Sequence, residues 1–466
     1  MNFLFKDING KGWRARFLKL KKNQSFDILE LQESNREKYP FLLESSSRGN
    51  TKNRYSILFY KPKILLKKNS FEEINFLEKF DKLWEKEKIF QDKTFLGEKK
   101  IPFCGGWFVY LGYEIAKEIE EKLKIPESPF YLPTAFAARI NSSIIYDHID
   151  REIYFTSDKF DSFADDFDDM QNDLFKIYDS KKSNNSSGSV EILFKDTSEE
   201  HQEQVRACID YIYQGEIFQA NLSRLWKFRA NDNLSDFDIY RQLRKKNPSP
   251  FSGLVIYENS SIISSSPERL VSVEGNLLQT RPIAGTRPRG GSGLLDIELS
   301  KELINSDKEK AEHLMLVDLE RNDISRVCKP GTVEVDEMMI IESYAHVHHI
   351  VSNIRGEKMK KSTPGKIISA VFPGGTITGC PKVRCMEILG DLEKVGRGPY
   401  TGSMGYVTHS GNMDINILIR SILKEDNNLF FRAGGGIVAD SIPENETLET
   451  EAKANGMLKA IGSFKK

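Results

Sequence analysis

Four carboxylates in the last third of the chain form two pairs with the same spacing. Glu309 and Glu312 are three residues apart, and so are Glu446 and Glu449. On a helix, residues i and i+3 lie on one face, so each pair would present its two carboxylates together. If the two helices face each other, the four side chains could hold a hard cation. Magnesium fits this set, because it prefers oxygen, binds few carboxylates directly and leaves positions for water and an anionic substrate.

Three glycine-rich segments lie near or between these pairs and could bind the anion. They are 281–290 (RPIAGTRPRG), 372–382 (FPGGTITGCPK) and 433–438 (AGGGIV), and we expect each to form a turn. Segment 372–382 opens a predicted helix near Lys382 but lacks the Walker spacing, so we interpret it as an anion-binding turn and not as a nucleotide loop. The alternatives are an ordinary basic loop at 281–290 and a close strand crossing at 433–438.

Further residues could act on an acidic substrate. Glu268 follows a predicted strand, and Arg420 ends an apolar strand, where a guanidinium could bind a carboxylate through two hydrogen bonds. In the segment HVHH, His346 and His348 would share one face of a strand and His349 would lie on the other. No nearby partner completes a zinc set, so we expect one of these histidines to contact the substrate, with zinc as the less favoured alternative.

The elements that would position these residues follow from hydrophobic periodicity and helix-start signals. Helices are predicted at 197–214, 308–320, 364–371, 384–391 and 444–461, and strands at 54–60, 105–113, 142–147, 253–257, 261–265 and 345–356, with three more between 401 and 440. Many adjacent strands with grouped helices indicate an α+β fold built on antiparallel sheet, and not a doubly wound fold.

Composition limits the class of protein. The 466 residues carry 67 basic and 68 acidic side chains, so general electrostatic binding to nucleic acid is not expected. No apolar run is long enough to cross a membrane, the N-terminus lacks a signal-peptide pattern, and the five scattered cysteines are typical of reduced thiols, so we expect a cytoplasmic protein. A polar stretch at 181–189 should form an exposed loop between an N-terminal region, 1–185, and a catalytic region, 195–463.

Taken in order, these segments resemble the chorismate-utilising enzymes, strongly from about 195 to 463 and more weakly before that. This family includes the large subunit of anthranilate synthase, component I of aminodeoxychorismate synthase, isochorismate synthase and salicylate synthase. The resemblance implies a large α/β sandwich of antiparallel sheets wrapped by helices, with magnesium and chorismate in a deep cleft.

The resemblance also implies roles for the acidic residues. Glu312 and Glu449 match the direct magnesium ligands, and Glu309 and Glu446 match residues that act through water or support the ligands. Magnesium would bind the ring carboxylate of chorismate. Glu268 matches the general acid that protonates the departing C4 hydroxyl, and burial would support this role by keeping the carboxyl protonated near neutral pH.

Other positions match the substrate-binding residues of the family. The resemblance places the enolpyruvyl carboxylate of chorismate against Tyr400, Arg420, Gly434, Gly435 and Thr286, the ring against His349 and Thr376, and Lys453 beside the metal. The substrate would therefore contact residues from several predicted strands and turns.

Gln219 is the position that best separates the reactions of the family. Isochorismate and salicylate synthases that resemble this chain have a lysine there, which activates water. Glutamine cannot act as that base, so the resemblance favours ammonia as the nucleophile. The chain lacks a nucleophile-elbow cysteine with a matching histidine and glutamate, so we expect ammonia to come from a separate glutamine amidotransferase subunit.

Two aminated products are consistent with the sequence. Segment 374–384 and the Gly-Gly-Trp at 105–107 resemble aminodeoxychorismate synthases, and we favour 4-amino-4-deoxychorismate, a precursor of 4-aminobenzoate and folate. The alternative is anthranilate, formed with pyruvate in tryptophan biosynthesis. At position 284 this chain has alanine, as anthranilate synthases do. Well-known aminodeoxychorismate synthases have a lysine at this position, and that lysine attacks C2 covalently. A further alternative, from another class, is a non-catalytic homologue that binds chorismate or tryptophan.

Two segments resemble the tryptophan site of anthranilate synthases. They comprise Leu43, Glu44 and Ser45 in the first and Asn247, Pro248, Ser249, Pro250 and Phe251 in the second. The structural alternative is a strand and a proline turn that fill an interface. We expect weak or purely structural tryptophan binding, and not tight inhibition.

Overall fold

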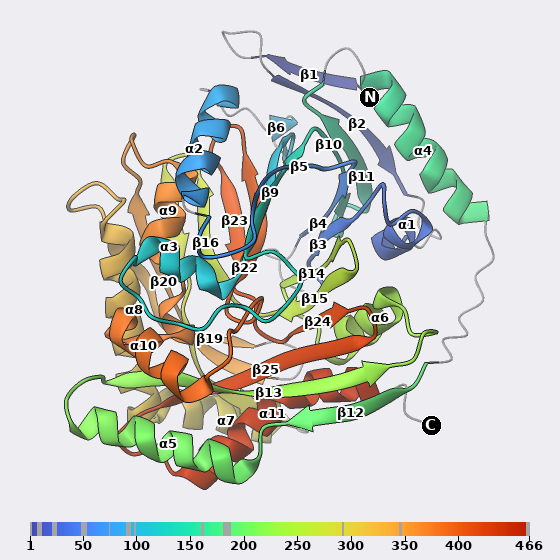
Figure 1. Ribbon diagram of the computed structural model, residues 1–466. Helices are drawn as coiled ribbons and strands as arrows, with labels where there is room; N and C mark the ends of the chain where they lie inside the picture. Colours follow the sequence, from blue (N-terminus) through green and yellow to red (C-terminus); the bar gives the residue numbers. More distant parts are fainter. Residues whose placement is uncertain are drawn as a thin grey trace.

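The computed structural model shows two large antiparallel sheets packed face to face, with helices over their outer faces (Figure 1). It describes residues 2–6, 12–20, 26–47, 54–73, 75–89, 95–96, 99–159, 163–179, 188–290, 293–343 and 347–462. These layers confirm the predicted α+β sandwich of antiparallel sheets wrapped by helices. None of the described helices combines the length and the apolar character needed to span a bilayer.

The larger sheet joins strands from both sequence regions. Its order is β1 (Asn2–Lys6), β2 (Gly12–Lys19), β11 (Glu152–Ser157), β10 (Ser142–Asp147), β4 (Tyr55–Tyr60), β3 (Phe41–Glu44), β14 (Phe251–Tyr257), β15 (Ser260–Ser266), β24 (Ser421–Glu425), β25 (Asn428–Ile437), β13 (Gln219–Ala230) and β12 (Val190–Lys195), with β21 (Gly379–Cys380) paired to β13. Because β3 pairs with β14, the regions 1–185 and 195–463 share this sheet and do not form separate sheets.

The smaller sheet is shared in the same way. Its order is β18 (Ile283–Pro288), β20 (Val347–Glu357), β17 (Leu277–Thr280), β16 (Arg269–Glu274), β23 (Met413–Asn416), β22 (Ser403–Thr408), β8 (Gly106–Leu111), β9 (Ala135–Ile140) and β5 (Lys63–Lys68), with β19 (Glu334–Ser343) paired to β20. The short strands β6 (Phe95–Leu96) and β7 (Lys99–Lys100) pair with each other. The N-terminal region enters this sheet where β8 pairs with β22.

Aromatic side chains fill the layer between the two sheets. Phe41 of β3 stacks on Phe108 of β8, with ring centroids 4.5 Å apart and an interplanar angle of 22°. Phe59 packs edge-on against Phe103, with centroids 5.1 Å apart. Successive side chains of a strand point to opposite faces, so Phe41 enters this layer while its neighbour Leu42 packs on the outer face.

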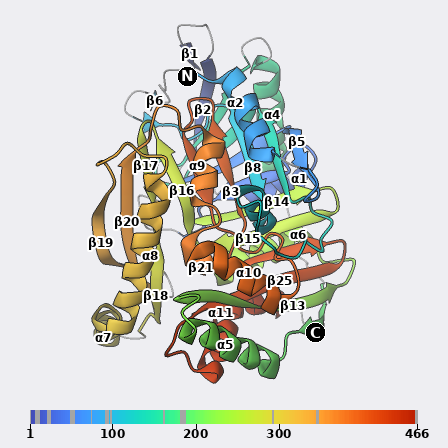
Figure 2. The ribbon, with the colours of Figure 1, turned by 60° about the vertical axis from the view of Figure 1, so that its left-hand side comes forward.

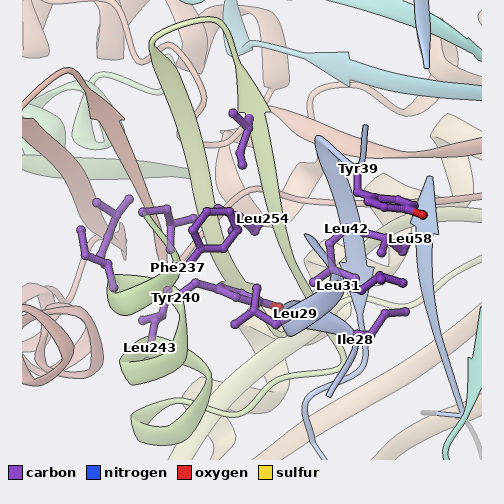
Figure 3. Packing of buried hydrophobic residues seen from close by; sticks show 14 of the residues in the cluster. Ile28, Leu29, Leu31, Tyr39, Leu42, Leu58, Phe237, Tyr240, Leu243 and Leu254 are labelled. Carbon is purple, nitrogen blue, oxygen red and sulfur yellow. The ribbon is translucent and has the colours of Figure 1, made fainter. Parts of the chain in front are cut away.

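Helices cover the outer face of the larger sheet. They are α1 (Ile28–Ser34), α4 (Phe163–Asp179), α6 (Asp236–Lys246) and α11 (Pro443–Gly462). Figure 3 shows part of this packing, with Leu29 of α1 and Tyr240 of α6 among side chains that pack near Leu42 and Leu254 of the strands. The apolar face of each helix is buried against the sheet, which fixes where its ends lie.

A second group of helices covers the smaller sheet. It comprises α2 (Phe76–Glu87), α8 (Asp307–Ser325) and α9 (Pro364–Val371), and α8 runs beside β20 (Figure 2). The other helices are η1 (Tyr113–Ile115), α3 (Ala116–Ile119), α5 (Ser198–Tyr213), α7 (Gly293–Asn305), η2 (Gly375–Ile377) and α10 (Lys382–Glu393). The five helices predicted from the sequence are all present. Thr197 and Glu200 form a complete capping box at the start of α5.

Two predictions about the C-terminal strands are wrong. The span 401–440 contains the four strands β22 to β25, and not three. Arg420 does not end a strand, because β23 stops at Asn416 and Arg420 lies in the connection to β24 with a φ of +51°. A positive φ interrupts the extended backbone path of a strand, and hydrophobic periodicity does not reveal it.

Two of the three glycine-rich segments are strands and not turns. Segment 281–290 contains β18, and segment 433–438 begins within β25. A Cβ on Gly434 would lie 2.6 Å from the carbonyl oxygen of Leu222 in β13, so glycine allows this close approach. Segment 372–382 does form a turn, through η2. Of the predicted polar loop at 181–189, residues 181–187 lie outside the described part of the chain.

Replacing Phe41 with alanine should destabilise the fold strongly. The ring is 2% exposed and touches aromatic rings of the other sheet, so its loss removes apolar contact and leaves a cavity. We expect the free energy of unfolding, measured by urea denaturation, to fall by about 3–5 kcal/mol. Tyr131→Ala is the control, because that side chain is 85% exposed and should cost at most about 0.5 kcal/mol. Equal losses in the two variants would contradict the packing of the two sheets on Phe41.

Candidate active site

One large cavity lies where strands of both sheets meet α8 and α11. Its volume is about 1190 Å³. Of the predicted metal-binding, catalytic and substrate-binding residues, those that line it are Gln219, Glu268, Glu309, Glu312, His349, Thr376, Tyr400, Arg420, Gly434, Glu446, Glu449 and Lys453. Gly435 is not among the lining residues, although a Cβ there would come within 3.6 Å of the Glu449 carboxylate. The backbone of Thr286 is part of β18, and its side chain lies outside what the structure describes.

Glu312 and Glu449, the two carboxylates predicted to bind magnesium directly, each have a close polar partner. The side-chain amide of Gln219 donates to Oε1 of Glu312 at 2.7 Å. The ammonium of Lys453 pairs with Oε1 of Glu449 at 2.7 Å. Gln219 is the first residue of β13, and Lys453 lies one turn after Glu449 on α11. A residue of β13 therefore orients Glu312, and a residue of α11 orients Glu449.

The other two carboxylates, those of Glu309 and Glu446, also have polar partners. The guanidinium of Arg287, in β18, pairs with Glu309 at 3.2 Å. The hydroxyl of Ser441 donates to Oε1 of Glu446 at 2.7 Å. Four carboxylates around one cavity repel one another, and these partners offset part of that repulsion.

The residue types around the cavity fit a magnesium ion. Among the residues that the structure describes, no three histidine, cysteine, aspartate or glutamate side chains are arranged as a ready metal site. Magnesium needs only one or two protein carboxylates when a substrate and water supply the remaining oxygens. Glu312 and Glu449 could provide them, in competition with Gln219 and Lys453 for the same oxygen atoms.

Glycines in β25 leave the space in which these side chains meet. A Cβ on Gly436 would lie 2.3 Å from Nε2 of Gln219 and 3.0 Å from Oε1 of Glu312. A Cβ on Gly435 would lie 3.4 Å from Oε2 of Glu446. Any larger residue at Gly436 would therefore separate the groups that line the cavity.

Glu268 is a buried acid in the cavity wall. It follows β15 and is 5% exposed. Burial raises the pKa of its carboxyl from about 4.5 to about 7, although the nearby Thr376 hydroxyl and the charge of Arg420 act in the opposite direction. Its Oε1 has no hydrogen-bond partner among the described residues. Glu268 can therefore hold a proton near neutral pH and offer it to a molecule in the cavity.

Arg420 adds a positive charge to the wall of the same cavity. No described residue forms an ion pair or a hydrogen bond with its guanidinium. Burial lowers the pKa of this group, and the negative charge available on Glu268 opposes that effect. A half-buried guanidinium that lines a cavity favours an anion, and a carboxylate can take two of its hydrogen bonds. Tyr400 lines the same cavity beside β25, since a Cβ on Gly434 would be 2.8 Å from its hydroxyl oxygen.

Two neighbouring histidines of β20 have different surroundings. His349 lines the cavity, and its Nδ1 lies 3.3 Å from the carbonyl oxygen of Gly285. Burial lowers the pKa of His349 to about 3, so its ring is neutral. His348 instead lies 2.9 Å from Asp296. His348 and His349 therefore do not form a zinc site together, and His346 lies outside the described residues.

Arg432 also lines the cavity, and the sequence analysis did not identify it. Its guanidinium lies 3.5 Å from Glu393, which also pairs with Arg397 at 2.7 Å. The guanidinium of Arg397 lies over the Tyr400 ring, 5.6 Å from its centroid, so the network helps to fix Tyr400. Strand alternation could have identified Arg432, because it lies two residues before Gly434 and shares its face.

A second, smaller cavity lies beside the predicted tryptophan segments. It has a volume of about 130 Å³, and the predicted residues that line it are Leu43, Glu44, Ser45, Pro250 and Phe251. Glu44 accepts a hydrogen bond from Tyr240 at 2.7 Å and pairs with Arg244 at 3.0 Å. Asn247 lines the large cavity instead, and Pro248 and Ser249 lie in the connection from α6 to β14.

A known protein family matches most of this chain. The sequence model of the chorismate binding enzymes matches residues 39–459. The chain belongs to this family. The match extends across both sequence regions, as do the two sheets of the fold.

Relatives of two kinds are similar to this chain. Anthranilate synthase component 1 of Acetivibrio thermocellus is 37% identical over 90% of each chain. Aminodeoxychorismate synthase component 1 of Bacillus subtilis is 39% identical over 77% of each chain. The crystal structure of anthranilate synthase component I from Streptococcus pneumoniae has a TM-score of 0.73 and 29% identity, over 87% of this chain and 92% of that one. This member of the family is a chorismate-utilising enzyme. Because relatives of both kinds are similar to it, the comparison does not distinguish between the two reactions.

Replacing Glu268 with glutamine should make the fold less sensitive to alkaline pH. The carboxyl titrates near 4.5 in an unfolded chain but near 7 in the folded protein. The unfolded chain therefore releases this proton first, and the wild type loses up to about 3 kcal/mol of stability as pH rises from 4.5 through 7. Glutamine cannot ionise, so the variant should keep that stability. Urea denaturation at about pH 5 and about pH 8 measures the difference, and an equal pH dependence in both proteins would contradict the raised pKa.

Proposed function

We propose that this enzyme aminates chorismate in a magnesium-dependent reaction and forms 4-amino-4-deoxychorismate. The observation that best supports this is the position of Glu268, a carboxyl with a pKa near 7, in the cavity that also holds Arg420 and the two carboxylate pairs. Chorismate is a dianion whose C4 hydroxyl needs an acid in order to leave. The cavity offers an acid for that hydroxyl, a guanidinium for one carboxylate and oxygen ligands for a metal at the other.

Glu268 would act as the general acid of this reaction. It would transfer its proton to the C4 hydroxyl, which departs as water. Arg420 and Tyr400 would hold the enolpyruvyl carboxylate, while the neutral ring of His349 would lie along the substrate. Magnesium, when bound to the carboxylate pairs, would neutralise the ring carboxylate and stabilise the charge that develops on the substrate.

Gln219 supports ammonia, and not water, as the nucleophile. The side chain is buried and donates its amide hydrogen to Glu312. An amide cannot take a proton from water, whereas ammonia attacks without such activation. The relatives are named component 1, which is consistent with a partner subunit, and a glutamine amidotransferase is the class of partner that would supply ammonia.

Anthranilate is the second candidate product, and one feature of the cavity favours it. Ala284 lines the large cavity and has no amine, so its side chain cannot attack C2 of chorismate covalently. Lys453, an amine that does line the cavity, pairs with Glu449. Direct attack of ammonia on C2 would give anthranilate, whereas 4-amino-4-deoxychorismate needs another nucleophile at C2. The turn at 374–384 and the similarity to the Bacillus subtilis enzyme favour the first product.

We also propose that the smaller cavity binds tryptophan weakly or serves only in packing. Glu44 is already engaged by Tyr240 and Arg244, so its carboxylate is not free to accept a ligand. The volume of about 130 Å³ leaves little room for an indole ring and its amino-acid group without movement of the wall.

The purified chain should convert chorismate into a compound that yields 4-aminobenzoate only when an aminodeoxychorismate lyase is added. The assay contains chorismate, magnesium and an ammonium salt at alkaline pH, and products are separated by chromatography. Fluorescent anthranilate in the absence of the lyase would identify the second candidate instead. Chelation of magnesium should abolish turnover, because the ring carboxylate then has no counter-ion. Undiminished turnover after thorough chelation would contradict the metal assignment.

Glu268→Gln should lower kcat by at least about 100-fold while chorismate still binds. Glutamine keeps the size and the hydrogen bonds of the acid but has no proton to transfer to the leaving group. Calorimetry measures binding, and product formation measures turnover. Glu425→Gln is a matched control, because Glu425 is also a buried carboxyl with a raised pKa but does not line the cavity. If the protein only binds chorismate or tryptophan, neither the wild type nor these variants will form product.

A further inference from the structure

The large cavity opens to solvent beside two helices, α6 and α11. Among the described residues that line it, every exposed one belongs to one of these two helices. The helices meet at this point, since a Cβ on Gly456 of α11 would lie 3.2 Å from the side chain of Asn247, which follows α6. Glu268 and His349 line the cavity as well, but both are buried. A ligand therefore enters past the ends of α6 and α11 before it reaches the buried wall.

Lys245 and Lys246, the last two residues of α6, place positive charge at this entrance. Both are exposed and line the cavity, and neither ammonium group forms an ion pair or a hydrogen bond with a described residue. Arg244, one residue earlier, instead pairs with Glu44 at 3.0 Å, so its charge is balanced within the fold. Basic residues at the end of a helix stabilise its dipole, which accounts for their charge but not for their position on the cavity lining.

The other charged residues at the entrance do not cancel these two charges. Lys453 and Lys459 of α11 are exposed lining residues, and Lys453 pairs with Glu449 at 2.7 Å. Glu449 is the one acid among the exposed lining residues that the structure describes. The entrance is therefore positive overall, whereas the carboxylates deeper in the cavity would repel an anion. Positive charge at the entrance offsets part of this repulsion.

We propose that Lys245 and Lys246 capture chorismate at the entrance by electrostatic attraction, a proposal that rests on the proposed function only in taking chorismate as the ligand of this cavity. Chorismate carries two carboxylates, and charges at the mouth of a cleft raise the local concentration of an oppositely charged substrate and its rate of association. At an ionic strength of about 0.1 M such attraction extends over about 10 Å. The two lysines lie at the opening and not beside Glu268, so they affect the arrival of the substrate and not its conversion.

Replacing both lysines with glutamine tests this capture in the full chain with chorismate, magnesium and an ammonium salt. At an ionic strength of about 0.1 M, kcat/KM for chorismate should fall by at least about 3-fold while kcat stays unchanged. At about 1 M salt the Debye length is about 3 Å, so the variant and the wild type should then have the same kcat/KM. Lys245→Glu combined with Lys246→Glu should lower kcat/KM further, because the reversed charges repel the substrate. The KM for ammonia, which is uncharged, should not change.

Lys360→Gln combined with Lys361→Gln is the matched control. These two lysines are also adjacent and exposed but do not line the cavity, so the control has the same net charge as the glutamine variant and should behave as the wild type. An equal loss in the control, a lower kcat, a loss that persists at about 1 M salt, or an unchanged kcat/KM would each overturn the capture. Calorimetry with chorismate separates this result from the proposed function. If the wild type forms no aminated product but the glutamine variant binds chorismate more weakly at low salt, the proposed function fails and the capture stands.

Discussion

Mutual repulsion among acidic groups is the constraint on which the architecture of this site depends. Four carboxylates face one cavity, and a fifth, Glu268, is buried in its wall. Such charges destabilise one another unless each is paired or protonated. The fold supplies a different solution for each group. Gln219 donates a hydrogen bond to Glu312, Lys453 forms an ion pair with Glu449, and burial favours the protonated form of Glu268 near neutral pH.

One buried wall has opposite effects on two kinds of titratable group. Removal from water raises the pKa of Glu268 and lowers that of His349, and both changes favour the uncharged form. Arg420 remains charged beside them, because a guanidinium does not lose its proton in proteins. The wall therefore presents the positive charge of Arg420 to an anionic ligand, together with a neutral acid and a neutral imidazole that can donate or accept a proton.

The sequence revealed the parts of the site that follow from local periodicity. The spacing of the glutamates on α8 and α11 is visible in the chain, and so are the helix-start signals and the strand that ends before Glu268. Arg420 was misplaced because its positive φ depends on the connection between two strands. Gly434 was read as part of a turn because the approach of Leu222 comes from a strand far away in sequence.

The pairing of β3 with β14 has a consequence for biogenesis. Strand β3 is synthesised early, but the edge that it offers to β14 stays open until Phe251 and the residues after it have left the ribosome. Open edges invite pairing with other chains, and such distant contacts slow folding. The nascent N-terminal half is therefore a natural client for chaperones during translation, and expression at low temperature should favour recovery of the intact molecule.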